Sequence, residues 1–284
     1  MANIKDLKQR IVSITNTRQI TNAMKMVAAA KLRKAQNNAV SVRPYANEVA
    51  HMIAVLRAKQ TLSDHPFMTL NTKKSKTLLV VVTGDKGLCG SFNSSILRQA
   101  EHYLAENSNC EIISIGKKGS DYFRKSKHTV LQEYIGLFHD FNIALTNEIA
   151  KKIRVHFLED DYKDVVVIYN EFKSAIQNEV ITKELLPVLP NEDLEYRKIE
   201  YLYEPEEDTI VDELIEKYVN IEIWRSFVES FAAENASRMT AMDNATENAS
   251  DLISELSLEY NRERQASITT EIIEVSSGAE AINS

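Results

Sequence analysis

Apolar residues recur in alternating steps of three and four along the first 56 positions of the chain. Thirteen of the sixteen positions in this seam are apolar, and the seam runs through Ile4, Leu7, Ile11, Ile14, Arg18, Thr21, Lys25, Ala28, Leu32, Ala35, Ala39, Val42, Ala46, Val49, Ile53 and Leu56. A repeat sustained in this way is typical of a helix that pairs in a coiled coil. Pro44 lies inside the repeat and should kink the helix or start a new turn, because its ring removes one backbone hydrogen bond.

The C-terminal segment keeps the same register from Val211 to Tyr260. No proline follows Pro205 and Gly278 is the only glycine, so the pattern predicts one helix over about 207–280, roughly 110 Å long at 1.5 Å per residue. The two terminal helices flank the middle segment, and we expect them to pair antiparallel from a common base. Aligning position 57 with position 207 puts Ile4 near position 257, which leaves a C-terminal tip without an intrachain partner.

The middle of the chain alternates strand and helix signals. Strands are expected over 77–82, 111–116, 128–134, 164–172 and 179–188, and helices over 93–107 and 138–160. This alternation is typical of an α/β unit with a mainly parallel, Rossmann-like sheet. The predicted domains are an N-terminal coiled-coil helix (1–58), an α/β basal domain (76–203) and a C-terminal coiled-coil helix with a protruding tip (207–284).

The net charge of −7 hides an asymmetry along the chain. Residues 1–60 hold 11 Lys and Arg against 2 Asp and Glu, whereas residues 204–284 hold 5 against 19. A basic arm often binds nucleic acid, but the acidic helix offers an intramolecular partner, so we expect no nucleic-acid binding. The sequence has no apolar run of 18 residues and no secretion signal at its start. The two cysteines, Cys89 and Cys110, are expected to stay reduced.

The stretch "VVVTGDKGLCGS" (80–91) tests whether the chain is a nucleotide enzyme. Its glycines follow the spacing G-x-x-G-x-x-G, which departs from the dinucleotide pattern G-x-G-x-x-G, and no Gly-Lys-Ser/Thr completes a Walker loop. The favoured interpretation is a strand-to-helix turn whose glycines supply positive φ and close packing. Two alternatives stay open: a nucleotide-dependent enzyme using the 83–91 loop, and a coiled-coil scaffold. No catalytic, cofactor-binding or metal-ligating set of residues stands out in the sequence.

Five blocks of the sequence resemble the gamma subunit of bacterial F-type ATP synthases. They are "NTRQITNAMKMVAAAKLRKAQ" (16–36), "TGDKGLCGSFN" (83–93), "YLYEP" (201–205), "SRMTAMDNATENA" (237–249) and "RQASITTEIIEVSSGAEAI" (264–282). The resemblance spans the whole chain in order, whereas 187–200 matches nothing specific.

The resemblance implies a noncatalytic central rotor shaft. In that family the coiled coil lies inside a ring of three alpha and three beta subunits, and the base rests on the epsilon subunit and the membrane c ring. It further implies that ATP, ADP and Mg bind to the partner subunits, that this chain holds no cofactor and no small-molecule substrate, and that it sits peripherally on the cytoplasmic face of the cell membrane.

The resemblance also implies roles for individual residues. Met24 and Lys25 match the family's N-terminal strip that faces the beta subunits. Contacts to the beta subunits are also implied for Arg264, Gln265, Thr269 and Glu271. Contacts to the c ring are implied for Tyr201, Tyr203 and Glu204. The residues themselves allow another interpretation of Arg18 and Lys25, namely a polar layer that fixes the register of the coiled coil.

Overall fold

The computed structural model describes residues 4–58, 65–69, 74–137, 143–159, 161–174, 177–188 and 207–283. Its elements are, in chain order, α1 (Ile4–Ala58), β1 (Lys76–Val82), α2 (Phe92–Glu106), β2 (Cys110–Ile115), α3 (Lys117–Phe123), β3 (Thr129–Tyr134), α4 (Ile143–Glu159), β4 (Tyr162–Phe172), β5 (Asn178–Leu186) and α5 (Glu207–Asn283). The predicted fold class, α/β with long terminal helices, is confirmed. The chain divides into two compact units, 28–238 and the pair of segments 1–27 with 239–284, which we describe separately.

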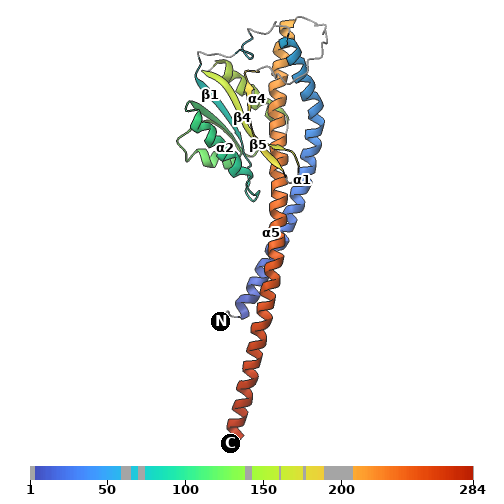
Figure 1. Ribbon diagram of the computed structural model, residues 1–284, viewed down its shortest axis with the longest axis vertical. Coiled ribbons are helices and arrows are strands. Elements are labelled where there is room, and N and C mark those ends of the chain that lie inside the picture. Colours follow the sequence, from blue (N-terminus) through green and yellow to red (C-terminus); the bar gives the residue numbers. More distant parts are fainter. Residues whose placement is uncertain are drawn as a thin grey trace. The chain divides into compact units, whose positions relative to one another are not determined.

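The larger unit is built on a five-stranded sheet in the order β3-β2-β1-β4-β5 (Figure 1). The first four of these strands are mutually parallel, and β5 pairs antiparallel with β4. The five predicted strands are therefore all present, within a few residues of their expected bounds. The mainly parallel character follows from the crossover helices α2, α3 and α4, because parallel neighbours require a crossover connection.

The central strand β1 shows why this sheet is covered on both faces. Six of its residues, Thr77–Val82, are completely or almost completely buried. A continuous β-branched and aliphatic run has no polar face to turn toward water, so helices must pack on both sides. Figure 1 shows α2 on one face of the sheet and α4 on the other.

The first of the two apolar cores lies under α4 and joins the sheet to both terminal helices. Strand residues Leu78, Val80 and Val82 pack there against α4 and against the segments of α1 and α5 that belong to this unit. The helical members are Val49, Ile53, Ile149, Ala150, Ile153, Phe157, Val211, Leu214, Ile215, Val219, Ile223 and Phe227. The same apolar cluster thus holds the sheet and the base of the helix pair together.

The second core lies on the opposite face, under α2 and α3. Leu79, Val81, Ile112, Val166 and Ile168 face Phe92, Ile96, Ala100, Leu104 and Phe123. Helix α3 was not predicted from the sequence, because its seven residues, KKGSDYF, lack an apolar period. It begins after Gly116, whose φ of +92° and close approach to the Thr83 carbonyl admit only glycine.

Two further expectations have mixed outcomes. Helix α1 continues through Pro44, so the proline does not end it. Helix α4 is described from Ile143, and the expected start over 138–142 lies outside the described residues. The helices α1 and α5 cover the ranges 4–58 and 207–283, close to those expected, whereas the division into three domains remains a prediction.

Candidate functional site

The smaller unit is an antiparallel pair made from the start of α1 and the end of α5. Leu7 and Leu256 are buried within it, at 4% and 6% exposure. Thr21 is also buried and its hydroxyl lies 2.8 Å from that of Thr246. One turn further, Lys25 Nζ lies 2.6 Å from Asp243 Oδ1. The predicted seam is confirmed at these positions, and two of its polar members, Thr21 and Lys25, are paired with polar residues of the other helix.

These contacts give the register of the helix pair. Thr21 faces Thr246 and Lys25 faces Asp243, so Ile4 falls opposite about position 263 when the pairing is continued. The expected partner of Ile4 was near position 257; equal spacing from the aligned positions 57 and 207 gives 260, so the observed pairing is displaced by about one turn of helix. The period of the seam does not set this offset, because the same apolar pattern can pair in more than one register.

The last turns of α5 extend beyond the described part of α1 in this unit. Residues 264–279 are exposed apart from the half-buried Ser267. Four aliphatic side chains stand out in this segment, Ile268, Ile272, Ile273 and Val275, with exposures from 42% to 73%. An isolated helix is marginal in water and gains most of its stability from packing. An exposed aliphatic helix end of this kind is typical of a surface that a partner covers.

The residues expected to contact beta subunits lie in the smaller unit. Arg264, Gln265, Thr269 and Glu271 are all exposed on the end of α5, and the Thr269 hydroxyl donates to the Gln265 carbonyl at 2.9 Å. Met24 and Lys25 are half-buried on α1, and Lys25 forms the ion pair with Asp243. The residues expected to contact the c ring, Tyr201, Tyr203 and Glu204, lie outside the described residues, as does 189–200.

The glycine loop packs against α5 within the larger unit. An added Cβ at Gly84 would lie 2.9 Å from the Glu234 carboxyl carbon, so a side chain there would require the Glu234 carboxylate to shift. Arg238 Nη2 donates to the carbonyls of Lys86 and Gly87 at 3.3 and 3.2 Å. Gly90 has a φ of +57°, as expected for a turn, whereas Gly87 shows neither a positive φ nor a close approach. The turn interpretation therefore holds for two of the three glycines.

The loop's polar groups are bound by the chain itself. Asn93 Oδ1 accepts a hydrogen bond from Gly84 N at 2.9 Å, and Gly84 O accepts one from Lys118 N at 3.1 Å. Asp85 Oδ1 accepts from Lys117 N and Gly136 N, both at 3.0 Å. A phosphate-binding loop directs such amides at its ligand. Here the Gly84 amide of the loop is occupied by the Asn93 side chain, and the Asp85 side chain of the loop accepts from amides of two other segments, which gives the nucleotide-enzyme hypothesis no support.

Glu234 is the buried acid at the centre of this contact. Its side chain is 7% exposed and its Oε1 lies 2.6 Å from Arg238 Nη2. Burial raises the pKa of the Glu234 carboxyl above its ordinary value of 4.5, and the guanidinium of Arg238 opposes this increase. The folded chain therefore binds this proton more readily than the unfolded chain does.

We expect the Glu234→Gln variant to remove one pH-dependent contribution to stability. A raised carboxyl pKa stabilises the fold fully below 4.5, and this stabilisation is lost as the pH rises through the folded value. The free energy of unfolding of the native chain, minus that of Glu234→Gln, should accordingly fall as the pH rises from 4.5. Urea unfolding of the full chain followed by circular dichroism measures it. A difference that is constant or rises with pH contradicts the assignment.

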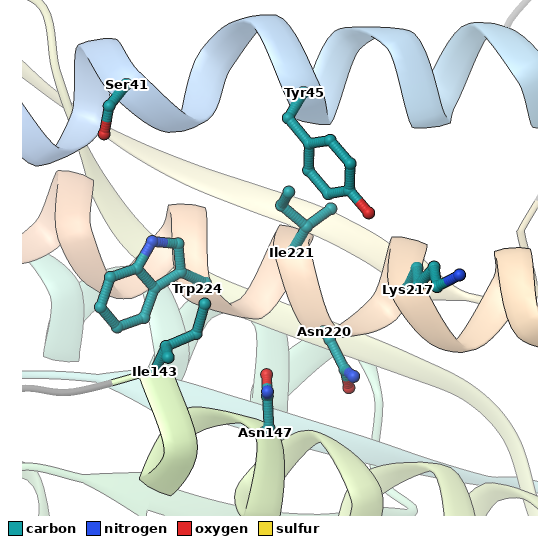
Figure 2. A pocket seen from close by; sticks show the side chains of 8 residues that line it. All are labelled: Ser41, Tyr45, Ile143, Asn147, Lys217, Asn220, Ile221 and Trp224. Atoms are coloured by element: carbon teal, nitrogen blue, oxygen red, sulfur yellow. The ribbon is translucent and has the colours of Figure 1, made fainter.

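A separate pocket of about 320 Å³ opens between α1, α4 and α5 in the larger unit (Figure 2). Its lining is Ser41, Tyr45, Ile143, Asn147, Lys217, Asn220, Ile221 and Trp224, with no residue of the glycine loop. Among the described residues no three His, Cys, Asp or Glu side chains come together as a metal site. None of the described helices is long and apolar enough to cross a membrane. Cys89 and Cys110 are free thiols.

These features define a class of protein. It is an α/β protein whose two terminal helices pair antiparallel and whose last helix extends beyond its partner with aliphatic residues exposed. The family model for ATP synthase matches residues 3–282. ATP synthase gamma chains of Chlorobium phaeobacteroides (strain BS1) and Geobacter sp. (strain M21) are each 43% identical over 99% of this chain and 99% of the relative. The chain belongs to the ATP synthase gamma chain family.

Solved structures agree with this assignment. A chain from the Tetrahymena thermophila mitochondrial ATP synthase, described as central stalk and c ring, is 30% identical with a TM-score of 0.62, covering 80% of this chain and 99% of that one. A chain of the Euglena gracilis mitochondrial ATP synthase has a TM-score of 0.69 and covers 98% of this chain and 94% of that chain. At 20% identity the Euglena likeness shows the fold alone.

Proposed function

We propose that this chain is the noncatalytic rotor shaft of an F-type ATP synthase. Its helix pair turns inside a ring of three alpha and three beta subunits, and its base rests on the epsilon subunit and the c ring at the cytoplasmic face of the cell membrane. ATP, ADP and Mg bind to the partner subunits, and this chain couples rotation of the c ring to their chemistry.

The observation that carries the proposal is the exposed end of α5. Residues 264–279 present aliphatic side chains such as Ile272 and Val275, at 62% and 73% exposure, in a segment that has no described intrachain partner. An enclosing ring of subunits would cover this surface. The relative from Tetrahymena thermophila carries the description central stalk and c ring, which supports the same role.

The side chains on the helix pair suit a shaft that turns. The smaller unit contains one aromatic residue, Tyr260, and its large exposed apolar side chains are aliphatic. Binding hot spots are enriched in Trp, Tyr and Arg. Four arginines accompany Tyr260 in this unit, but aromatic anchors are scarce, which favours a surface that holds no single orientation strongly and can turn past three equivalent sites. Arg264 lies on the end of α5, where with Gln265, Thr269 and Glu271 it would form the polar contacts to the beta subunits.

The ion pair between Lys25 and Asp243 refines the proposal for the N-terminal strip. Its side chains are 37% and 56% exposed, so the pair adds little to stability, on the order of 0–1 kcal/mol. Lys25 therefore stays available to an outside carboxylate at little cost. Met24, half-buried beside it, would contact the same partner surface.

Isolation of the chain at its native expression level tests the proposal. We expect it to copurify with three copies each of two larger nucleotide-binding subunits, and we expect the ATPase activity of the complex to remain with those subunits when they are separated. Micromolar binding of ATP, NAD or FMN to the isolated full chain in equilibrium dialysis would instead favour an enzyme that uses the 83–91 loop.

A further inference from the structure

Within the larger unit, α5 makes polar contacts along two lines, which are sets of residues at two angular positions around the helix axis. Arg154 of α4 donates to Glu216 at 2.5 Å and also to Asn220, and the glycine loop meets Glu234 and Arg238. At about 100° per residue, from 3.6 residues per turn, these four α5 residues fall within a narrow strip along the helix.

Strand β5 supplies the second line of contacts. Lys183 Nζ lies 2.5 Å from Glu222 Oε2, and Asn178 Nδ2 donates to Ser237 Oγ at 3.0 Å. Glu222 and Ser237 lie roughly a quarter turn or more around α5 from the first line on the same helical geometry. On the same geometry Ile223 lies between the two lines, Val219 beside the second line and Phe227 beside the first, and all three are fully buried.

The two kinds of contact constrain different motions. Apolar burial is non-directional, so by itself it resists separation of the helix from the sheet more than rotation about the helix axis. Hydrogen bonds and ion pairs depend on direction and distance, and they weaken steeply when donor and acceptor are displaced. Polar contacts on two sides of one helix therefore oppose its rotation in both senses.

The glycine loop makes the contact to α5 that involves the most groups at one point. Glu234 and Arg238 side chains are 7% and 12% exposed, and a single nitrogen of Arg238 lies within hydrogen-bond distance of Glu234 and of the Lys86 and Gly87 carbonyls. On its other side the loop is tied through Asp85 to the start of α3 and to Gly136. The loop thus connects α5 to the carboxyl edge of the sheet through hydrogen bonds on both of its sides.

We propose that Gly84, Glu234 and Arg238 form a torsional clamp through which the α/β domain and α5 pass torque to one another. This inference rests on the proposed rotor function. It gives the glycine loop a mechanical role in place of nucleotide binding. The three act as positioning residues: they keep the orientation of α5 about its axis constant relative to the sheet. A methyl group at Gly84 would displace the Glu234 carboxylate from its present position, which is expected to weaken the contact.

Angular fluctuations of the α/β domain in the assembled ATP synthase test the clamp. The alpha–beta ring is fixed to a surface, and a bead is attached through Lys127→Cys, an exposed position, in a Cys110→Ser background. With the ring paused, the angular distribution of the bead should broaden in Gly84→Ala and broaden further in Arg238→Met. The matched control is Arg124→Met, which breaks the exposed ion pair with Glu133 inside the α/β domain and should leave the distribution unchanged.

A second-site variant separates the clamp from a general folding defect. Glu234→Asp withdraws the carboxylate by one methylene, so it should restore a narrow distribution in the Gly84→Ala background. If the Arg238→Met variant does not assemble, the Gly84→Ala variant is compared with the double variant Gly84→Ala/Glu234→Asp. An angular distribution that is broad in the single variant and narrow in the double variant supports the clamp. A distribution that stays narrow in Gly84→Ala, or broadening without rescue, overturns it.

The same measurement distinguishes failure of the clamp from failure of the rotor. Rotation of the bead on the native complex when ATP is added supports the rotor function. If the bead then shows the same angular distribution on the paused variants as on the paused native complex, the clamp is wrong although the rotor function stands. If the native bead does not turn, the proposed function itself fails, and with it the basis of the clamp.

Discussion

Removal of residues 264–284 should abolish most of the coupling between rotation and ATP synthesis while leaving the rest of the chain folded. Residues 264–279 of the deleted segment are exposed apart from the half-buried Ser267, and exposed positions contribute within about 0.5 kcal/mol each to stability. The proposed contacts to the beta subunits, from Arg264 to Glu271, all lie inside it. ATP-driven proton pumping per ATP hydrolysed by the reassembled complex measures coupling, and thermal unfolding of the isolated full-length and shortened chains measures stability.

A longer deletion serves as the control for this truncation. Removing residues 250–284 also takes away Leu256, which is 6% exposed against α1, so this variant should lose stability as well as coupling. Unfolding of the α/β domain by the shorter deletion would contradict the proposal that the tip is independent of the fold. Undiminished coupling after the shorter deletion would contradict its role as the contact surface.

The second large effect is expected from Phe227→Ala. Phe227 is fully buried in the cluster that joins α5 to the sheet and to α4. Truncation of a buried phenylalanine leaves a cavity and costs about 3–5 kcal/mol. Because a domain is stable by only about 5–15 kcal/mol, the variant should unfold at a much lower urea concentration.

Urea unfolding of the full chain measures this loss. The matched control is Leu258→Ala on the same helix, at 73% exposure, which should change the free energy of unfolding by less than about 0.5 kcal/mol. Equal losses in the two variants would show that α5 is not held to the sheet through Phe227.

Local elements of this fold are readable in the sequence because their signals are periodic. The seam from Leu7 to Ile53 follows the period of a helix pair, and the run Thr77–Val82 is apolar without alternation, as a strand covered on both faces requires. Helix α3 escaped prediction because it is short and polar, and its start depends on Gly116 approaching Thr83, a contact between distant segments.

The candidate site shows the same division. The unpaired tip was predicted from the lengths of the two helices, whereas its polar contact residues were identified through the resemblance of "RQASITTEIIEVSSGAEAI" to a known family; the exposure of 264–279 agrees with an unpaired tip. The contact of Gly84 with Glu234 was missed, since a glycine between strand and helix carries no information about a carboxylate 150 positions away. The only local sign was the pair Glu234 and Arg238 at helical spacing, which also suits an exposed surface.

The sequence by itself determined the helices, the strands and the class of fold, because each depends on the spacing of apolar side chains over a few turns. Only the tertiary structure decided the offset of the helix pair, which places Thr21 against Thr246, and the partners of the glycine loop. Both depend on which distant surfaces fit together. The period of apolar side chains leaves that choice open, because sliding one helix by two turns preserves its apolar pattern but changes every contact.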